Sequence, residues 1–359
     1  MSNRVVVAMS GGVDSSATAA LLKEQGYDVI GVTMRTWTDE AGPDGTAGLS
    51  CPGPADEEDA RRVAQALGIP FHTVDVAQEF KAEVIDYFRR EYAAGRTPNP
   101  CIRCNREVKL SALTEKVRDL GIDFDRFATG HYARVEYDAS KRRYLLKKAV
   151  DTDKDQSYFL FSLSQEQLSL CMFPLGEHTK EEARSIAGKL GLGLDSRPES
   201  QDFAARGHPA LWEKAQPGPI VNKYGDILGE HHGLPYYTIG QRKGLGIAVG
   251  SPLYVTAIDP ASNTVVVGPK EDVYSDMFTA SQLNWVSIEE LTQPVEARAK
   301  IRYLHKEADA VIAPQGHGRV QVRFAEPQMA IAPGQAVVFY DGDGILGGGF
   351  IEGPTADPG

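Results

Sequence analysis

The segment from Arg4 to Gln25 most constrains what this chain can fold into. Residues 4–9 form a short apolar run rich in β-branched side chains, which predicts a buried strand. From residue 16 to 25 the apolar residues recur at helical spacing. The turn between them, residues 10–15, has two adjacent glycines that let the backbone approach a ligand closely. Because free N–H groups gather where a helix starts, the turn predicts an anion site, with phosphate as the expected guest.

The turn reads Ser-Gly-Gly-Val-Asp-Ser and lacks the lysine that kinases and GTPases place beside a γ-phosphate. A loop without this lysine is suited to binding pyrophosphate as the leaving group of a reaction at the α-phosphorus. It resembles the loop of the PP-loop ATP pyrophosphatases, which holds ATP while its α-phosphorus is attacked. The alternative is a plain strand-to-helix turn with Asp14 or Ser15 as N-cap. The resemblance implies a role for Asp14 in placing Mg²⁺, and phosphate contacts from Ser10, Gly11, Gly12, Ser15 and Ser16.

Length and composition narrow the class of protein. A chain of 359 residues is long for one domain, so two or three domains are expected. Without a membrane-length apolar run or a signal-peptide pattern, we expect a cytoplasmic protein with no membrane partner. We also expect a monomer. Four cysteines are too few for a disulfide framework. A net charge of −11 argues against an indiscriminate nucleic-acid binder but leaves room for a local basic surface.

Strand and helix alternate through the first part of the chain. Residues 28–34 predict a second strand, 55–67 a helix and 70–76 a third strand, which indicates an α/β fold with a doubly wound parallel sheet. Ligands bind at the carboxyl ends of such strands, where the glycine turn, the residues after Met34 and the loop with Cys51 would converge. Met34 could then meet an adenine; the alternative is a core side chain.

A second candidate site follows a predicted helix over residues 77–94. The Pro-Asn-Pro stretch at 98–100 keeps the chain extended, and helical spacing resumes near residue 105. Cys101 and Cys104 thus sit at a helix entrance, flanked by Arg96, Arg103 and Arg106. A helix N-terminus and nearby cations both lower the pKa of a thiol, so both cysteines are candidate reactive thiolates. The alternatives are an inert turn or half of a zinc site.

The later part of the chain changes character. Periodicity is lost between residues 197 and 212, and turns and short β runs follow, among them 236–246 and 253–259. Gln241, Arg242 and Lys243, between glycines and tyrosines, predict a nucleic-acid contact, with a solvated turn as the alternative. Alternating segments at 297–303, 320–324 and 336–340 predict a small C-terminal β-barrel. We therefore expect domains at 1–205, 206–272 and 273–359.

A series of motifs, taken in this order, resembles the tRNA-specific 2-thiouridylases over nearly the whole chain. The resemblance implies that ATP adenylates the C2 oxygen of the uridine at position 34 of tRNA(Lys), tRNA(Glu) and tRNA(Gln), after which sulfur displaces AMP. The uridine must leave the anticodon stack to react. The motifs are Ser10–Ser16, Gly95–Pro100, Cys104–Asn105, Thr129–Tyr132, Lys154–Tyr158, Glu199–Asp202, His232–Leu234, Thr238–Gly246 and Pro333–Gln335.

The same resemblance assigns roles to individual residues. It implies that Cys104 and Cys101 are catalytic and that Ala8, Met9, Val13, Met34 and Gly130 bound the ATP site beside the glycine turn. It implies tRNA contacts from Asn99, Pro100, Cys101, His131, Lys154, Asp155, Gln156, Arg302, Tyr303 and Gln335. The sulfur would come from a cysteine desulfurase, a relay protein or inorganic sulfide.

Two positions depart from the family's pattern. Most members have Asp where this chain has Cys101, and a cysteine shortly after Ser-Gln-Asp, where this chain has Phe203 and Ala204. In the usual mechanism the missing cysteine carries a persulfide and the counterpart of Cys104 resolves the intermediate, so that shuttle is impossible here.

Three explanations compete for this departure. Cys101 and Cys104 form the redox pair; or Cys51, Cys101 and Cys104 ligate a [4Fe–4S] cluster that accepts exogenous sulfide; or an engineered Ala204 leaves the chain inactive. We favour the cluster, because the cysteine gained at position 101 compensates for the cysteine missing at position 204. An inactive tRNA-binding homologue and an amide-forming PP-loop ligase are the alternative functions. Cys171, between Leu170 and Met172, is expected in the core.

Overall fold

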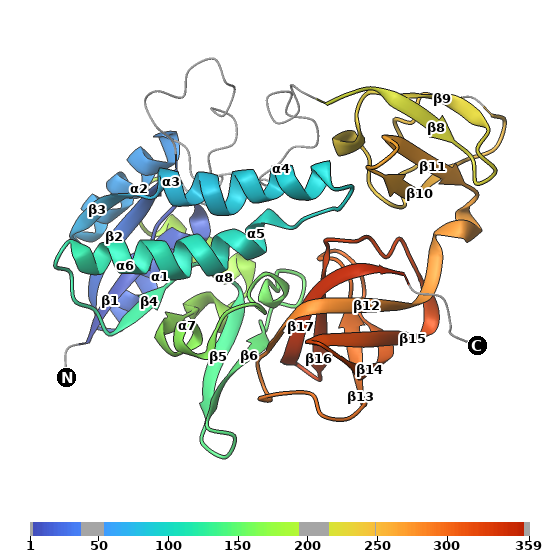
Figure 1. The fold of residues 1–359 in the computed structure, drawn as a ribbon. Coiled ribbons are helices and arrows are strands. Elements are labelled where there is room, and N and C mark those ends of the chain that lie inside the picture. Colours follow the sequence, from blue (N-terminus) through green and yellow to red (C-terminus); the bar gives the residue numbers. More distant parts are fainter. Residues whose placement is uncertain (1–2, 37–53, 194–214, 248, 355–359) are drawn as a thin grey trace.

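The computed structural model describes residues 3–36, 54–193, 215–247 and 249–354 (Figure 1). An α/β domain, at the left of the view, comes first in the chain; a small sheet lies at the upper right and a barrel at the lower right. This arrangement confirms the predicted fold class. Cys51, Ala204 and the Glu199–Asp202 motif lie outside the described residues, as does the boundary predicted at 205–206.

The N-terminal domain is built on a five-stranded parallel sheet with the order β3-β2-β1-β4-β7. Its central strand is the predicted apolar run, and Val5, Val6 and Val7 are buried because helices cover both faces. The strands are β1 (Arg4–Ala8), β2 (Asp28–Arg35), β3 (Phe71–Asp75), β4 (Arg126–Ala128) and β7 (Cys171–Met172).

The helices divide between the two faces of this sheet. One face packs against α1 (Val13–Glu24), α2 (Pro54–Leu67) and α8 (Lys180–Gly188). On the other face the core includes α3 (Ala77–Phe80), the π-helical turn η2 (Lys81–Ile85), α4 (Asp86–Ala93) and α7 (Gln165–Leu170). Residues 77–93 are therefore helical as predicted, with a π-helical turn in the middle. No helix among the described residues is both long and apolar enough to cross a membrane.

The helix that carries the two cysteines begins earlier than expected. Helical structure starts at α5 (Pro100–Arg103), continues through the π-helix η3 (Cys104–Ala112) and ends with α6 (Leu113–Asp119). The expectation that helix resumes near residue 105 is wrong. Proline at the first helical position needs no N–H partner, so Pro100 starts the helix rather than delaying it.

The central domain is a four-stranded sheet with the order β10-β11-β8-β9. Its strands are β8 (Gly218–Val221), β9 (Ile227–His231), β10 (Tyr254–Asp259) and β11 (Thr264–Gly268). The stretch 236–246, expected among the turns and short β runs, contains no strand and consists of turns after the short 3-10 helix η8 (Leu234–Tyr236). Gly240, Gly244 and Gly246 have positive φ angles, which an extended strand does not accommodate.

The C-terminal domain is a closed six-stranded barrel, because β12 pairs with both β15 and β17. The boundary predicted at 272–273 falls in the 3-10 helix η9 (Lys270–Val273), directly before the first barrel strand. The barrel strands are β12 (Tyr274–Trp285), β13 (Val295–Lys300), β14 (Ala308–Gly316), β15 (Arg319–Met329), β16 (Ala336–Asp341) and β17 (Gly344–Pro354).

A hairpin of the N-terminal domain joins the barrel directly. It consists of β5 (Ala133–Asp138) and β6 (Arg143–Lys148), and Lys147 of β6 pairs with Gly344 of β17. Lys148 Nζ lies 2.6 Å from a carboxylate oxygen of Glu307, and Arg134 lies 2.7 Å from Asp343. The barrel is therefore fixed to the N-terminal domain through a shared sheet edge and two ion pairs.

Candidate active site

The predicted phosphate turn lies between the end of β1 and the start of α1. Gly12 is the N-cap residue and has no side chain to cap the helix, so the first N–H groups of α1 stay available to a ligand. Its carbonyl oxygen accepts a hydrogen bond from the Ser16 hydroxyl at 2.8 Å, and the Ser10 amide donates to Ser15 Oγ at 3.1 Å. The turn thus has the form of an anion site held by its own serines.

Gly11 is required by this geometry for two reasons. Its φ of +71° is unfavourable for residues with a side chain. A Cβ atom here would also lie 2.6 Å from the carbonyl oxygen of Asp56, on α2. The turn is therefore wedged against α2, and a larger residue would displace one of them.

Asp14 is held by two side chains from distant parts of the sequence. The Lys180 ammonium lies 2.7 and 2.9 Å from its two carboxylate oxygens, and the Tyr132 hydroxyl donates to one of them at 2.9 Å. Lys180 is only 9% exposed, and its ammonium also lies 5.6 Å above the Tyr132 ring. Since Lys180 contacts both oxygens, this carboxylate is a poor direct Mg²⁺ ligand in the arrangement seen.

Sequence reasoning missed Lys180. It stands next to the capping residue of α8, Thr179, whose side chain accepts a hydrogen bond from the Glu182 amide. Such a capping box predicts where the helix starts, but it does not indicate that the following side chain, Lys180, lies against Asp14. The only available signal was the absence of a lysine from the glycine turn itself.

The segment after β4 lies directly against the turn. A Cβ atom on Gly130 would come within 2.8 Å of the Asp14 carbonyl carbon and the Ser15 amide nitrogen, so only glycine permits this approach. His131 follows, with its Nδ1 2.7 Å from the Thr129 hydroxyl. Burial holds the pKa of His131 well below its usual range, and Lys109 lowers it further, so the imidazole is neutral at pH 7.

Met34 lies in β2, and its side chain is buried in the core of the N-terminal domain. The structure therefore favours the core alternative for the side chain. The predicted adenine contact, which would use the backbone of Met34, stays a prediction.

Asn99 caps the helix that carries Cys101 and Cys104. Its side-chain oxygen accepts hydrogen bonds from the amides of Cys101 and Ile102, at 3.1 and 3.4 Å. Cys101 is half-buried and Cys104 is buried, within one turn of each other. The spacing of three places both cysteines on the same side of the helix.

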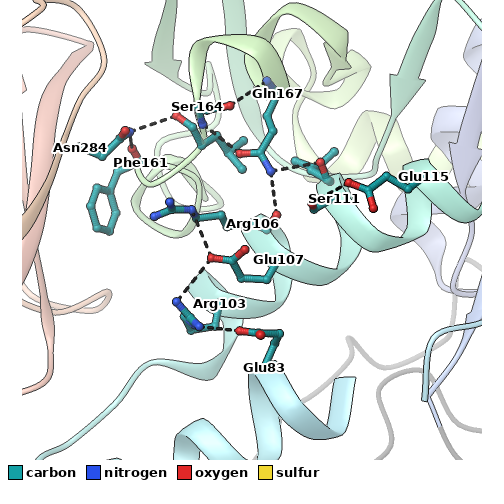
Figure 2. A network of polar contacts seen from close by, with 12 residues as sticks. Glu83, Arg103, Arg106, Glu107, Ser111, Glu115, Phe161, Ser164, Gln167 and Asn284 are labelled. Atoms are coloured by element: carbon teal, nitrogen blue, oxygen red, sulfur yellow. Dashed lines mark hydrogen bonds and ion pairs between the residues drawn. The ribbon is translucent and has the colours of Figure 1, made fainter. Parts of the chain in front are cut away.

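The arginines beside the cysteines are engaged with carboxylates. Arg103 lies 2.6 Å from Glu83 and 3.4 Å from Glu107, and Arg106 lies 3.3 Å from Glu107, as Figure 2 shows. Arg96 is likewise paired with Glu91 at 2.6 Å. These arginines thus form ion pairs with glutamates, and the reactivity predicted for the two thiols stays a prediction.

A cavity of about 400 Å³ opens beside Cys101, a volume typical of small-molecule sites. All three domains line it. Its walls combine aromatic rings with amide and hydroxyl groups and a single cation, Arg302. Seven residues predicted to contact tRNA line it together: Asn99, Pro100, Cys101, Gln241, Arg302, Tyr303 and Gln335.

Aromatic side chains that the sequence did not single out complete this cavity. The rings of Phe159 and Tyr303 lie 4.4 Å apart between centroids, and Phe88 and Tyr92 of α4 line the wall. Lys300 lies 5.5 Å from the centre of the Tyr303 ring. In the sequence Phe88, Tyr92 and Phe159 look like ordinary core positions, and only the folded structure shows that they line one cavity with the barrel loop that carries Tyr303.

The other predicted tRNA contacts divide into exposed and internal residues. Arg242 and Lys243 are exposed and Lys154 is partly exposed. Asp155 is only 7% exposed and accepts hydrogen bonds from Ala149 and Ser157, so in this arrangement it holds the local loop. Gln156 accepts a hydrogen bond from the amide of Tyr132 at 3.1 Å, which links this loop to the residue that contacts Asp14.

Sequence comparison places the chain in a known family. Residues 3–205, more than half of the chain, match the model of the tRNA methyl transferase HUP domain. Residues 211–269 match the tRNA methyl transferase PRC-barrel domain, and 275–351 the aminomethyltransferase beta-barrel domain. The tRNA-specific 2-thiouridylase MnmA of Heliobacterium modesticaldum is 52% identical over 98% of this chain and 93% of that protein. The chain belongs to the tRNA-specific 2-thiouridylases.

Another relative agrees: the tRNA-specific 2-thiouridylase MnmA 1 of Caldanaerobacter subterraneus subsp. tengcongensis is 50% identical over 98% of each chain. A solved 4-thiouridine synthetase–RNA complex with bound ATP matches at 18% identity and a TM-score of 0.32, over 59% of this chain and 49% of that one, a likeness too weak to carry any inference. The family expected from the motifs is confirmed, and with it the enzyme class, a tRNA sulfurtransferase. The roles of individual residues in this 2-thiouridylase remain predictions.

The iron–sulfur hypothesis depends on a cysteine that the structure does not describe. Within the described ranges, no group of three or more His, Cys, Asp or Glu side chains is arranged to hold a metal. Cys101 and Cys104 supply two of the three thiolates that the predicted cluster needs, and Cys51 lies in the segment left out. The predicted [4Fe–4S] cluster therefore stays a prediction for this chain.

Cys171 behaves as expected of a core residue. It is buried at the start of β7, and burial raises the pKa of its thiol far above the ordinary value. It is therefore an inert thiol and a useful control for the other cysteines.

Proposed function

We propose that this chain is the ATP-dependent enzyme that converts the uridine at position 34 of tRNA(Lys), tRNA(Glu) and tRNA(Gln) to 2-thiouridine. The observation that carries the proposal is the shared cavity: Cys101 lies in one wall, and other residues predicted to contact tRNA are among those that line the rest, namely Gln241, Arg302, Tyr303 and Gln335. The names of relatives that are about 50% identical over the full length support the same reaction.

The first half-reaction would use the glycine turn. The C2 oxygen of uridine attacks the α-phosphorus of ATP, the bond to the β-phosphate oxygen breaks, and pyrophosphate leaves. The N–H groups at the start of α1 and the hydroxyls of Ser10 and Ser15 would hold the departing phosphates. The Lys180 ammonium, beside Asp14, adds positive charge to this end of the site. Mg²⁺, when bound with ATP, would help neutralise the phosphate charge.

The second half-reaction would use the two thiols near the cavity. A persulfide on one of the pair Cys101 and Cys104 attacks C2 with its terminal sulfur, and AMP leaves. The thiol of the other cysteine then attacks the inner sulfur, which releases 2-thiouridine and leaves a Cys101–Cys104 disulfide. An external thiol reductant must restore the pair, and a sulfur donor must reload the persulfide.

The proposal is tested with purified chain, ATP, Mg²⁺, a persulfide donor and a tRNA(Lys) transcript, with 2-thiouridine measured by mass spectrometry of digested nucleosides. A transcript with cytidine at position 34 is the matched substrate control. Thiolation of the first transcript alone is the expected result. Absence of 2-thiouridine under both aerobic and anaerobic conditions would overturn the proposal and favour an inactive tRNA-binding homologue.

The same preparation decides between the dithiol and the cluster. Protein prepared without oxygen should contain no stoichiometric iron and should thiolate tRNA from a persulfide donor. Bound iron with absorbance near ~400 nm, lost in a Cys51→Ala variant, would instead establish the cluster.

A further inference from the structure

Leu304 is the most exposed large apolar side chain among the residues that the structure describes, at 91%. It lies in the loop between β13 and β14 of the barrel, on the rim of the cavity that contains Cys101. An exposed leucine alone is common on protein surfaces. Its position at the mouth of this cavity is what calls for an explanation.

The loop that presents Leu304 is held on both sides. Ile301 is buried in the barrel core, and the Tyr303 ring packs on Phe159 with 4.4 Å between centroids. The His305 amide donates to the carbonyl oxygen of Arg302 at 3.0 Å, which closes a turn around Leu304. The leucine is therefore displayed by a fixed turn.

The surroundings of Leu304 suit a single-stranded RNA loop. Tyr303 and Phe159 offer aromatic surface on which a base can stack. Arg302 lies two residues away, half-buried, and no described carboxylate pairs with it. Burial lowers the pKa of its guanidinium, but the group stays charged at neutral pH and is placed to meet a phosphate.

We propose that Leu304 is a wedge that enters the anticodon loop and occupies the place left by the extruded uridine. The inference rests on the proposed function, because thiolation at C2 requires the base to leave the stack. Apolar side chains inserted between base steps are a known way to hold nucleic acid unstacked. The base would then lie in the cavity beside Cys101 while Leu304 prevents its return.

The test compares Leu304→Ala with Leu304→Met, which keeps an apolar side chain of similar length. Ile227→Ala is the matched control, since Ile227 is 74% exposed on β9 and is not part of the cavity wall. In single-turnover thiolation we expect Leu304→Ala to react about tenfold more slowly, because the wedge no longer offsets part of the cost of unstacking the base. Leu304→Met and Ile227→Ala should stay close to the parent rate.

A second readout does not require chemistry. A tRNA with 2-aminopurine on the 3′ side of the target uridine should brighten when the parent protein binds, because the neighbouring base loses its stacking partner. Leu304→Ala should bind this tRNA with a smaller rise in fluorescence. In a substrate with an abasic site at that neighbouring position, where the stack is already broken, the rates of the two proteins should converge.

Two outcomes would overturn the wedge. One is an unchanged rate and fluorescence for Leu304→Ala. The other is a defect seen only with a protein persulfide donor and not with a small-molecule persulfide, which would mean that Leu304 binds the donor protein. If the parent protein extrudes the base but makes no 2-thiouridine, the proposed function fails while the wedge stands, so the two failures are distinguishable.

Discussion

The two ends of the proposed active site are built in opposite ways. The nucleotide end lies within one domain and depends on charge: Asp14, Lys180 and Tyr132 form a polar cluster with contacts of 2.7–2.9 Å. The base end is assembled from three domains and consists mainly of rings, prolines and amides around a cavity. The contrast suggests a division of labour. Phosphates need fixed donors and charge, whereas an extruded base needs a shaped, largely uncharged pocket.

The largest expected effect is a loss of sulfur transfer at the base end, with adenylation at the nucleotide end left intact. Cys104→Ala should lower tRNA thiolation by at least about 10³-fold, because removing a nucleophile removes the covalent route. Release of pyrophosphate in the presence of tRNA should continue, since adenylation does not use the thiol. Mass spectrometry of nucleosides and a pyrophosphate assay measure the two steps. Cys171→Ala is the thiol control, and an equal loss in that variant would contradict the assignment.

The next largest effect is expected on adenylation, at the nucleotide end alone. Lys180→Met should lower the adenylation rate by about 100-fold, the size seen when one preorganised charged contact is lost, with little change in the KM for tRNA. It should also lower the free energy of unfolding by about 2 kcal/mol, below the usual range for a broken buried pair because the Asp14 side chain is 32% exposed.

A double variant checks the physical reason for that loss. Asp14→Asn combined with Lys180→Met removes both charges, so urea unfolding should recover most of the lost stability while adenylation stays low. Recovery of activity along with stability would mean that the pair only supports the fold.

A smaller effect is expected at the base end. Tyr303→Ala should raise the KM for tRNA about tenfold, because stacking of a base on an aromatic ring contributes about 1–3 kcal/mol. The KM for ATP should not change. Tyr303→Phe keeps the ring and should bind tRNA as the parent does. A rise in the KM for ATP would contradict the separation of the two ends.

The smallest effect is a pH dependence at the junction between the ends. The pKa of His131 is depressed in the fold, whereas the unfolded imidazole titrates near about pH 6.5. Below that value the unfolded chain binds more protons, so His131 makes stability fall as pH falls towards its folded pKa. His131→Gln should therefore show a shallower acid loss in urea unfolding between pH 7.5 and 5. Exposed His317→Gln should match the parent.

Features that neighbouring residues encode could be predicted from the sequence, whereas features that arise from contacts between distant segments could not. The strand, turn and helix at residues 4–25 are encoded by adjacent residues, and the structure has them within a few residues of the prediction. The sequence pattern places the start of the cysteine-bearing helix too late, because prolines favour an extended chain but Pro100 is the first residue of this helix. Lys180 and Phe159 could not be found, because their importance arises only from packing against segments far away in the chain.

The sequence also suggested an activating role for the arginines near the cysteines. Proximity along the chain showed the cations but not Glu83, which reaches Arg103 from 20 residues earlier. The charges seen near a site in the sequence therefore give an upper limit on the electrostatic potential there. Compensating charges from other helices and strands are known only once the folded structure is known.

The β5–β6 hairpin bears on the distance between the proposed RNA contacts and the thiols. It leaves the N-terminal domain and ends at the barrel, where Lys147 pairs with Gly344 and Lys148 with Glu307. The hairpin thereby connects the barrel, whose β13–β14 loop carries Arg302 and Leu304, to the domain that contains Cys101. We expect this connection to set the spacing between the proposed RNA contacts and the thiols, so an anticodon loop with one nucleotide more or fewer should present the wrong base to Cys101.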